Sequence, residues 1–259
     1  MSRRVRRYLP AAALFIGVLA GWELVVRAFS VKQFLLPAPS AIASALLEHR
    51  DELAAAATST LYEAVGGFAI GGTAAIAVAL ATTRWTAARS ALLPFAIAAN
   101  SVPIIAFAPI MNNWFGVLNP LSKMMVVAVL VFFPIMINTV RGLTLVDPGS
   151  LELMRSYAAS ELAIFAKVRV PNALPYIFTA LKVSATLSLI GAIVAEYFGG
   201  AQSVLGQFII TEAAFFRFAN AWAAIIVATA VSIAFFSIIV AIERVAIPWH
   251  ASSGSRDAS

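Results

Sequence analysis

The sequence predicts an all-α integral membrane protein with about six transmembrane helices. Apolar residues make up 61% of its 259 residues and charged residues only 12%. A soluble domain carries about 25% charged residues, so this chain has too few charges to cover a surface that faces water. Apolar stretches of about 20 residues, the length that crosses a bilayer, also recur along the chain. These observations together indicate that a lipid bilayer surrounds most of the protein.

Six apolar stretches are candidates for the spans, and they cover residues 9–29, 61–81, 91–111, 121–140, 176–198 and 219–242. The first follows a basic segment, residues 1–8, as the apolar part of a signal peptide would. It is too long for a signal peptide and lacks a convincing cleavage site, so a retained helix is expected. Residues 9–245 then form the transmembrane domain, and residues 246–259 form a short tail.

The distribution of basic residues sets the expected orientation. If the N-terminus is inside the cell, 13 of the 18 Lys and Arg residues fall in cytoplasmic segments or at the helix ends beside them. Cytoplasmic loops of membrane proteins carry such an excess, so both termini are expected in the cytoplasm. The same bias accounts for the net charge of +6, which in a membrane protein gives no reason to expect a nucleic-acid partner.

The loop between the first two spans is expected to contain a short surface helix. A Pro-rich turn over residues 35–40 ends at Ser40, a residue type that caps helices. The helix would then cover residues 41–57, whose charged residues suggest that it lies at the membrane surface. This loop would be outside the cell.

The larger loop, residues 141–175, would be cytoplasmic and contain two short helices. Asp147 precedes a proline, which is the pattern of a helix start with a capping residue and Pro at the first helical position. Ser160 can cap a second helix, whose first turn would be stabilised by the following glutamate. Pro171 and Pro175 are expected to break the chain before the fifth span.

Several kinds of chemistry are missing from the sequence. No lysine follows a glycine, so the phosphate-binding loop of nucleotide-binding proteins is absent, and no cofactor site is expected on this chain. There is no cysteine and no His-Glu-x-x-His zinc motif. The two histidines, His49 and His250, fall in predicted loops and are expected at the solvated surface. Transport or scaffolding is therefore more plausible than catalysis.

The third span is the most interrupted one. It carries Asn100 and Ser101 near its middle and Pro103 just after them. A broken helix is tolerated in a membrane where its freed backbone groups face protein or a water-filled cavity. The span can therefore line a translocation pathway, or it can be a kinked packing helix whose Asn100 bonds a neighbour. Both readings remain open.

Other polar residues in the spans are further pathway candidates, and these are Asn138, Ser184, Ser188 and Glu196. The serines can instead bond back to their own helix, and Glu196 can be an ordinary carboxylate at the membrane interface. In the second span, Gly67 and Gly71 form a pair of small residues that permits close helix packing. Packing within the subunit is expected there ahead of a subunit interface.

The larger loop carries a recognisable motif. It reads Glu152-Leu-Met-Arg-Ser-Tyr-Ala-Ala-Ser160, then nine residues of amphipathic helix, then Val-Pro171-Asn-Ala-Leu-Pro175. This resembles the EAA loop of binding-protein-dependent ABC importer permeases, which has Glu-Ala-Ala, three residues, Gly, and a Pro-bearing segment about a dozen residues later. Here Ala158 stands at the position of the motif glycine, which permits a left-handed turn that alanine resists.

The resemblance implies roles for individual residues and extends over nearly the whole chain. The loop would form a coupling helix that docks on an ATPase subunit, through Glu152, Arg155, Ser156, Ala158, Ala159, Ser160, Pro171 and Pro175. Leu-Pro-Ala-Pro-Ser40, Asn-Trp-Phe-Gly116 and Ala-Glu196-Tyr also look like family segments. They point to the branch that handles sulfonates, nitrate, taurine and thiamine-precursor pyrimidines, and within it to permeases for hydroxymethylpyrimidine or riboflavin.

The family implies a fold, partners and a location. The fold would be the type I importer transmembrane domain in the bacterial inner membrane, driven by a separate ATPase that holds the ATP and Mg²⁺. An external solute-binding protein would deliver the substrate, and a second copy of the chain would complete a homodimer in the bilayer. A rigid helix pair joined to the fifth span at Pro171 and Pro175 could pass ATPase closure to the pathway, giving alternating access.

Two alternatives from other classes remain. An ion-coupled secondary transporter would usually show internal repeats and ionisable residues deep in the membrane, whereas no repeat is visible and the charged residues cluster near span ends. A membrane scaffold without transport activity is disfavoured by the broken third span. A neighbouring gene for an ATPase would favour the importer over both.

Overall fold

The computed structural model describes residues 3–82 and 103–250, and within these ranges every regular element is a helix. Five helical segments there are long and apolar enough to cross a membrane, and they are Pro10–Ala28, Arg50–Thr82, Pro120–Thr144, Glu161–Tyr197 and Phe218–Ala246. They overlap five of the six predicted spans. Most of the remaining predicted span, residues 91–111, lies outside the described residues, and so do Asn100 and Ser101.

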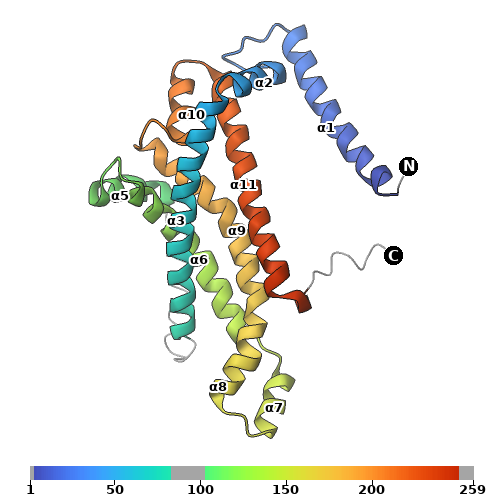
Figure 1. Ribbon diagram of the computed structural model, residues 1–259, viewed down its shortest axis with the longest axis vertical. Helices are drawn as coiled ribbons and strands as arrows, with labels where there is room; N and C mark the ends of the chain where they lie inside the picture. Colours follow the sequence, from blue (N-terminus) through green and yellow to red (C-terminus); the bar gives the residue numbers. More distant parts are fainter. Residues whose placement is uncertain (1–2, 83–102, 251–259) are drawn as a thin grey trace. The chain divides into compact units, whose positions relative to one another are not determined.

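The chain forms two compact units, residues 1–59 with 201–229 and residues 60–200 with 230–259. The first unit holds α1 (Arg3–Ala28), α2 (Pro39–Glu48), the start of α3 (Arg50–Thr82), α10 (Leu205–Ala214) and the first part of α11 (Phe218–Ala246) (Figure 1). Within it, the rings of Trp22 and Trp222 pack edge to face with centroids 5.6 Å apart. This contact joins α1 to α11.

The start of α2 corrects the predicted role of Ser40. The helix begins two residues earlier, at Pro39, and no side chain caps it from the preceding residue. Ser40 instead donates its backbone N–H and its hydroxyl to the carboxylate of Glu23, at 3.0 Å and 2.7 Å. A carboxylate at a helix N-terminus is favoured over a hydroxyl because it is charged and meets the positive end of the helix dipole.

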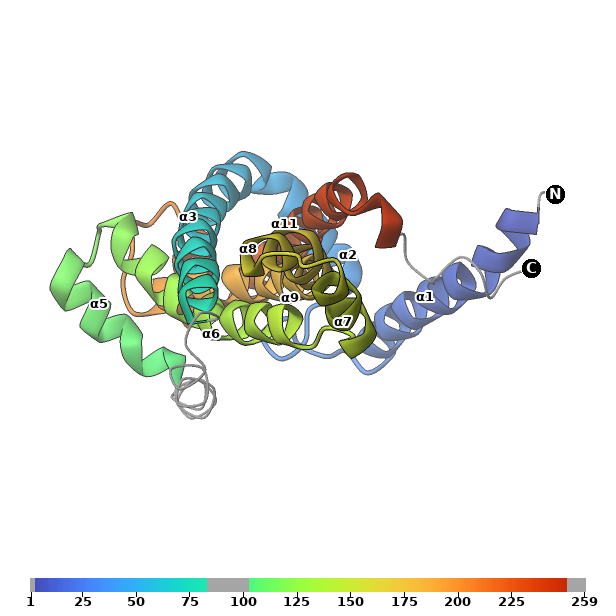
Figure 2. The same ribbon diagram turned by 90° about the horizontal axis from the view of Figure 1, so that it is seen from below.

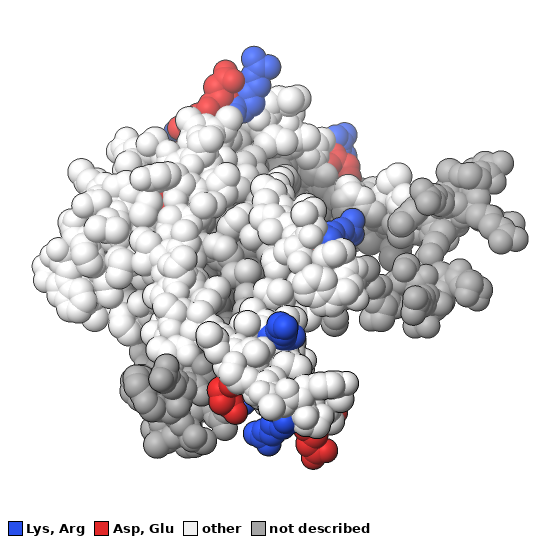
Figure 3. All heavy atoms as spheres, turned by 60° about the horizontal axis from the view of Figure 1, so that its bottom comes forward, with Lys and Arg blue, Asp and Glu red and all other residues white. Residues whose placement is uncertain are grey.

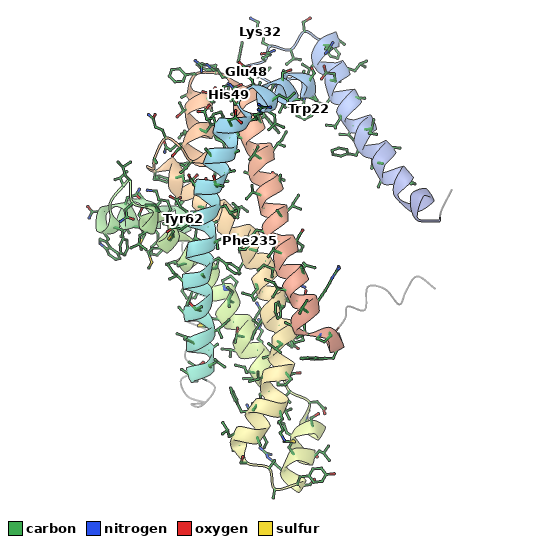
Figure 4. The ribbon with its side chains drawn as sticks, viewed as in Figure 1. Trp22, Lys32, Glu48, His49, Tyr62 and Phe235 are labelled. Carbon is green, nitrogen blue, oxygen red and sulfur yellow. The ribbon has the colours of Figure 1, made fainter. Side chains whose placement is uncertain are left out.

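The predicted helix over residues 41–57 is also divided differently. It ends at Glu48, and α3 then runs without interruption from Arg50 to Thr82, so the second span begins earlier than predicted. His49 lies at this junction (Figure 4) and is half-buried rather than solvated. Its ring contacts Asn220 at 3.2 Å and packs edge to face on Phe208.

The second unit contains the elements that matter for function. They are the rest of α3, η1 (Ile104–Ala106), α5 (Phe107–Phe115), α6 (Pro120–Thr144), α7 (Pro148–Ser156), α8 (Glu161–Ile164), η2 (Phe165–Arg169), α9 (Val170–Tyr197), the rest of α11 and η3 (Pro248–His250). Helices α6 and α9 lie side by side, and α7 and α8 connect them beyond one end of the pair (Figures 1 and 2). We call this the loop end, and the opposite end of the pair the far end.

The core of the second unit is apolar and close-packed. Val131 and Ile135 of α6 and Leu189 and Ala192 of α9 are fully buried in it. Phe235 of α11, labelled in Figure 4, packs edge to face on an α3 phenylalanine with ring centroids 5.2 Å apart. Such contacts between side chains supply the attraction that the hydrophobic effect cannot supply inside a lipid bilayer.

The glycine pair of the second span packs inside the subunit, as predicted. A Cβ added at Gly67 would lie 2.5 Å from the carbonyl oxygen of Met124, and one at Gly71 would overlap the carbonyl oxygen of Ala128. The backbones of α3 and α6 therefore approach too closely for any side chain at these two positions.

The expected break at Pro171 and Pro175 is wrong. The helix is continuous from Glu161 to Tyr197, because α8 passes through the five-residue π-helical turn η2 directly into α9. Pro171 has no N–H for the carbonyl one turn earlier, and the wider π turn lies just before it, where that bond would be missing. Helix α8 is consequently joined to α9 by continuous helix rather than by a flexible segment.

Candidate functional site

The first short helix of the loop, α7, starts as predicted. Asp147 is its N-cap, and the carboxylate accepts the backbone N–H of Ser150 at 2.9 Å and its hydroxyl at 3.0 Å. Pro148 occupies the first helical position, where its missing N–H costs nothing. The N–H of Ser150 lowers the pKa of Asp147 below its ordinary value, so the cap stays ionised throughout the neutral pH range.

The end of α7 explains the glycine of the family motif. The N–H of Ala159 donates to the carbonyl of Met154, and the N–H of Ala158 donates to that of Arg155. This pair of bonds is the Schellman motif, which places its C′ residue in the left-handed region. Ala158 is that residue, with φ of 51°. Ala158 therefore adopts the left-handed conformation that a glycine adopts easily, at a cost of about 1 kcal/mol.

The second short helix also starts as predicted. The hydroxyl of Ser160 accepts the N–H of Ala163 at 3.3 Å, and Glu161 lies in the first turn. Caps at Asp147 and Ser160 thus fix both short helices by local bonds. The loop therefore has a defined shape even though little of it is buried.

The loop presents an exposed face of mixed character. Glu152, Arg155 and Ser156 are exposed, and Figure 3 shows acidic and basic side chains together at this end of the molecule. Two large apolar side chains stand beside them: Tyr157 is 76% exposed and Leu162 77%. An apolar surface rimmed by charges is typical of a protein interaction site, so the loop is suited to receive a partner.

A side-chain amide joins the loop to both long helices. The Nδ2 group of Asn172, in the first turn of α9, donates to the carbonyls of Gly142 and Leu145 at the end of α6, at 2.7 Å and 3.0 Å. Beside it, a Cβ added at Gly142 would lie 2.7 Å from the Cα of Ala173. We call Gly142, Ala173 and Asn172 with its bonds the loop tie.

The predicted pathway residues have mixed surroundings. Asn138 donates to the carbonyl of Pro134 in its own helix at 2.8 Å, and Ser188 likewise to that of Ala185 at 2.8 Å. Ser184 is fully buried, and its hydroxyl has no hydrogen-bond partner among the described residues. Pro103 is exposed and precedes η1. Their role in a pathway stays a prediction, and the two back-bonded groups are satisfied locally.

Glu196 lies at the end of α9, as the alternative of a helix-terminal carboxylate expected, but its side chain is buried, with 0% exposed. The carboxyl of Glu63 on α3 lies within hydrogen-bonding reach of it, and the ammonium of Lys123 on α6 interacts electrostatically with both carboxyl groups. Glu63 and Lys123 are only 5% and 1% exposed.

A fourth residue completes this cluster at the far end. The Nζ of Lys123 donates to Oδ1 of Asn112 at 3.2 Å and also to the carbonyl of Val117. Asn112 in turn donates its Nδ2 group to the carbonyl of Phe198 at 3.1 Å. We call Glu63, Asn112, Lys123 and Glu196 the far tie, because they join α3, α5, α6 and α9.

Three of these residues were missed by the reasoning from sequence. The expectation that charged residues cluster near span ends treated Lys123 as an outer-side charge and gave Glu63 no role. Each is the only Asp, Glu, Lys or Arg in a long apolar stretch of its span, which was the signal that could have identified it. An ionisable residue inside a span is rare and usually paired.

Comparison with known proteins identifies the family. Residues 67–248 match the model of the binding-protein-dependent transport system inner membrane component. The formylaminopyrimidine transport permease protein ThiX of Halalkalibacterium halodurans is 29% identical over 96% of this chain and 98% of its own. SsuC of Escherichia coli, a permease named for aliphatic sulfonates, is 31% identical over 76% of each chain.

A solved structure supports the fold. It is described as an amino acid ABC transporter with histidines, and it aligns with a TM-score of 0.61 at 18% identity over 77% of this chain and 96% of its own. At that identity the likeness concerns the fold alone. With the family match covering most of the chain, the α7 loop and the membrane helices that carry it belong to a permease subunit of the binding-protein-dependent ABC importer family.

Proposed function

We propose that this subunit imports a small neutral heterocycle, a thiamine-precursor pyrimidine or riboflavin, and that its α7 loop receives the force of a separate ATPase. The observation that carries the proposal is the exposed face of the loop, which is capped into a fixed shape and continuous by helix with α9. The chain has no Gly-Lys phosphate-binding motif, so ATP hydrolysis would take place in a partner.

The expected mechanism is alternating access. Closure of the ATPase would move α7, and the helix through η2 and α9 would carry that movement toward the far end. Two copies of the chain would enclose the pathway, with both termini and the α7 loop in the cytoplasm. An external binding protein would deliver solute at the other side.

The substrate class rests on two considerations. ThiX, a relative that aligns over 98% of its own length, is named for a formylaminopyrimidine. The spans consist mainly of apolar residues such as Ala, Ile, Val and Phe and carry few fixed charges, which is compatible with a flat, neutral heterocycle. The alternative is an aliphatic sulfonate, taurine or nitrate, which the 31% identity to SsuC favours.

The coupling role can be tested by one charge reversal. Glu152→Lys should leave membrane insertion unchanged but abolish transport by the complex of permease, ATPase and binding protein reconstituted in liposomes. Glu48→Lys is the matched control, because Glu48 is also an exposed helical glutamate but lies outside the loop. Normal transport by Glu152→Lys, or equal loss in both variants, would contradict the assignment.

The orientation and the substrate need separate measurements. The chain has no cysteine, so a single cysteine at Ser156 can be labelled from either side of intact cells, and labelling from outside would refute a cytoplasmic loop. A thermal-shift screen of the cognate binding protein against pyrimidines, riboflavin, taurine and nitrate then identifies the solute. A shift with taurine or nitrate alone would favour the alternative class.

A further inference from the structure

The far tie joins elements that are distant in the sequence. Lys123 bonds the α5–α6 turn at Val117 and the α5 helix at Asn112, while Asn112 bonds the end of α9 at Phe198. Gly199 adds to this junction, because a Cβ there would lie 2.5 Å from the Cγ1 of Val117. The ends of α6 and α9 are therefore held through one lysine and one asparagine.

The carboxyl groups extend the junction to α3. Glu63 and Glu196 face each other closely enough to hydrogen-bond, and Lys123 lies beside both. Two buried carboxylates repel each other unless they share a proton. With one shared proton, the pair carries a single negative charge, and Lys123 balances it. The far tie is then neutral as a whole, which the burial of its ionisable groups favours.

The helix pair α6–α9 is consequently fixed at both ends. The loop tie holds it beside α7, through Asn172 and the close approach of Gly142 to Ala173. The far tie holds it at the opposite end, and apolar residues fill the core between them. A pair joined in this way transmits a displacement along its whole length rather than bending between its ends.

We infer that Glu63, Lys123 and Glu196, with Asn112, are positioning residues that make the far ends of α3, α6 and α9 move as one body when the α7 loop is displaced. This inference rests on the proposed coupling function. All four side chains are buried, Lys123 and Asn112 are hydrogen-bonded to each other and to backbone carbonyls, and the two carboxyl groups interact electrostatically with Lys123. They therefore act on the pathway through the helices they hold.

A graded series of variants tests the charge balance. Glu63→Gln keeps the side-chain volume and leaves one carboxylate, so the site still carries a single negative charge. The ATP hydrolysed per solute transported should therefore stay within about twofold of the natural chain. Glu63→Gln with Glu196→Gln leaves Lys123 as a lone buried cation, and this ratio should rise about tenfold per assembled complex. Adding Lys123→Met to this double variant removes the lone cation, so the complex should assemble. The hydrogen bonds of Lys123 are still lost, so the ATP hydrolysed per solute should remain raised.

The control is Thr139→Val, a buried polar residue of α6 whose hydroxyl bonds only its own helix. It should couple normally. Coupling equal to the natural chain in the triple variant, or full uncoupling by Glu63→Gln alone, would overturn the inference. If the natural complex itself hydrolyses ATP without any transport, the proposed function fails and the inference fails with it.

A distance measurement provides a readout that does not depend on the solute. Spin labels at Leu121→Cys on α6 and Phe198→Cys after α9 are feasible, since both residues are at least 36% exposed and the chain has no other cysteine. In the natural background the distance should be the same with and without ATP bound to the partner. In the triple variant it should differ between the two states. An unchanged, narrow distribution in the triple variant would refute the positioning role.

Discussion

The two ends of the α6–α9 pair are held together by different chemistry. At the loop end, the half-exposed amide of Asn172 and a close backbone contact hold the two helices together, and water can replace the amide bonds. At the far end, three ionisable side chains are buried, and a buried charge that loses its partner is costly. Opening the far end therefore exposes unbalanced charge, whereas opening the loop end exchanges one set of neutral bonds for another.

The difference indicates where the subunit can adapt. A loop that binds and releases a partner during each cycle benefits from contacts that can loosen at small cost. Under the proposed function, the far end is expected to keep its arrangement through the cycle, because a free buried charge is costly. The variants below are ordered by how strongly each should disturb one end or the other.

The largest effect is expected from removing the cation of the far tie. Lys123→Ala leaves the carboxyl groups of Glu63 and Glu196 without their counter-charge, which should lower the free energy of unfolding by about 3–5 kcal/mol. Thermal unfolding of the purified complex in detergent measures this loss. Lys167→Ala, which removes an exposed lysine of η2 at the loop end, should change it by less than about 0.5 kcal/mol. Equal effects of the two variants would show that the ends do not differ.

The next effect concerns the close approach at the loop tie. Gly142→Val adds a side chain whose Cβ would lie 2.7 Å from the Cα of Ala173. Helix α6 must then move away from α9, at a cost of about 1–3 kcal/mol. Gly72→Ala is the matched control, because its Cβ would meet only the end of Ile135 at 3.5 Å. Unfolding midpoints that fall in both variants would mean that glycine as such, and not the contact, is needed.

A smaller effect is expected when only the hydrogen bonds of the loop tie are lost. Asn172→Ala removes two bonds to the end of α6, each worth about 1 kcal/mol at most in a site that water reaches. Stability should fall slightly, while transport per ATP should fall more, because α7 would no longer move α9 directly. Measuring both quantities on the same preparation separates the two effects. A loss of stability without any loss of coupling would show that the continuous helix through η2 is sufficient.

Local signals made the loop predictable from sequence. Asp147 before a proline and Ser160 before a glutamate are caps whose bonds reach only three residues along the chain, and both were found. The pair Gly67 and Gly71 likewise gave a contact that follows from residue size. The continuity of the helix past Pro171 was not predicted, since the π turn that permits it has no marker in the sequence.

The far tie could not be assembled from sequence for a different reason. Its members are separated by many residues along the chain, and only the packing of α3, α6 and α9 brings them together. Glu196 was selected as a polar residue of its span, while Lys123 was counted among the basic residues on the outer side. A lone ionisable residue in a span indicates that a partner exists, but it does not say which span supplies the partner.

The smallest effect should be a gain. Ala158 is held at a φ of 51° by the Schellman bonds of Ala159 and Ala158, and a left-handed conformation costs a non-glycine residue about 1–2 kcal/mol. Ala158→Gly removes this strain but adds chain entropy to the unfolded state, so the loop should become more stable by about 1 kcal/mol or less. Hydrogen exchange at the amides of Ala158 and Ala159 measures the local opening, which should slow. Ala159→Gly, one position beyond the strained residue, relieves no strain and only adds chain entropy to the unfolded state. The amides of this variant should therefore exchange faster. If Ala158→Gly also exchanged faster, the alanine would not be strained, and the glycine of the family motif would need an explanation other than its backbone conformation.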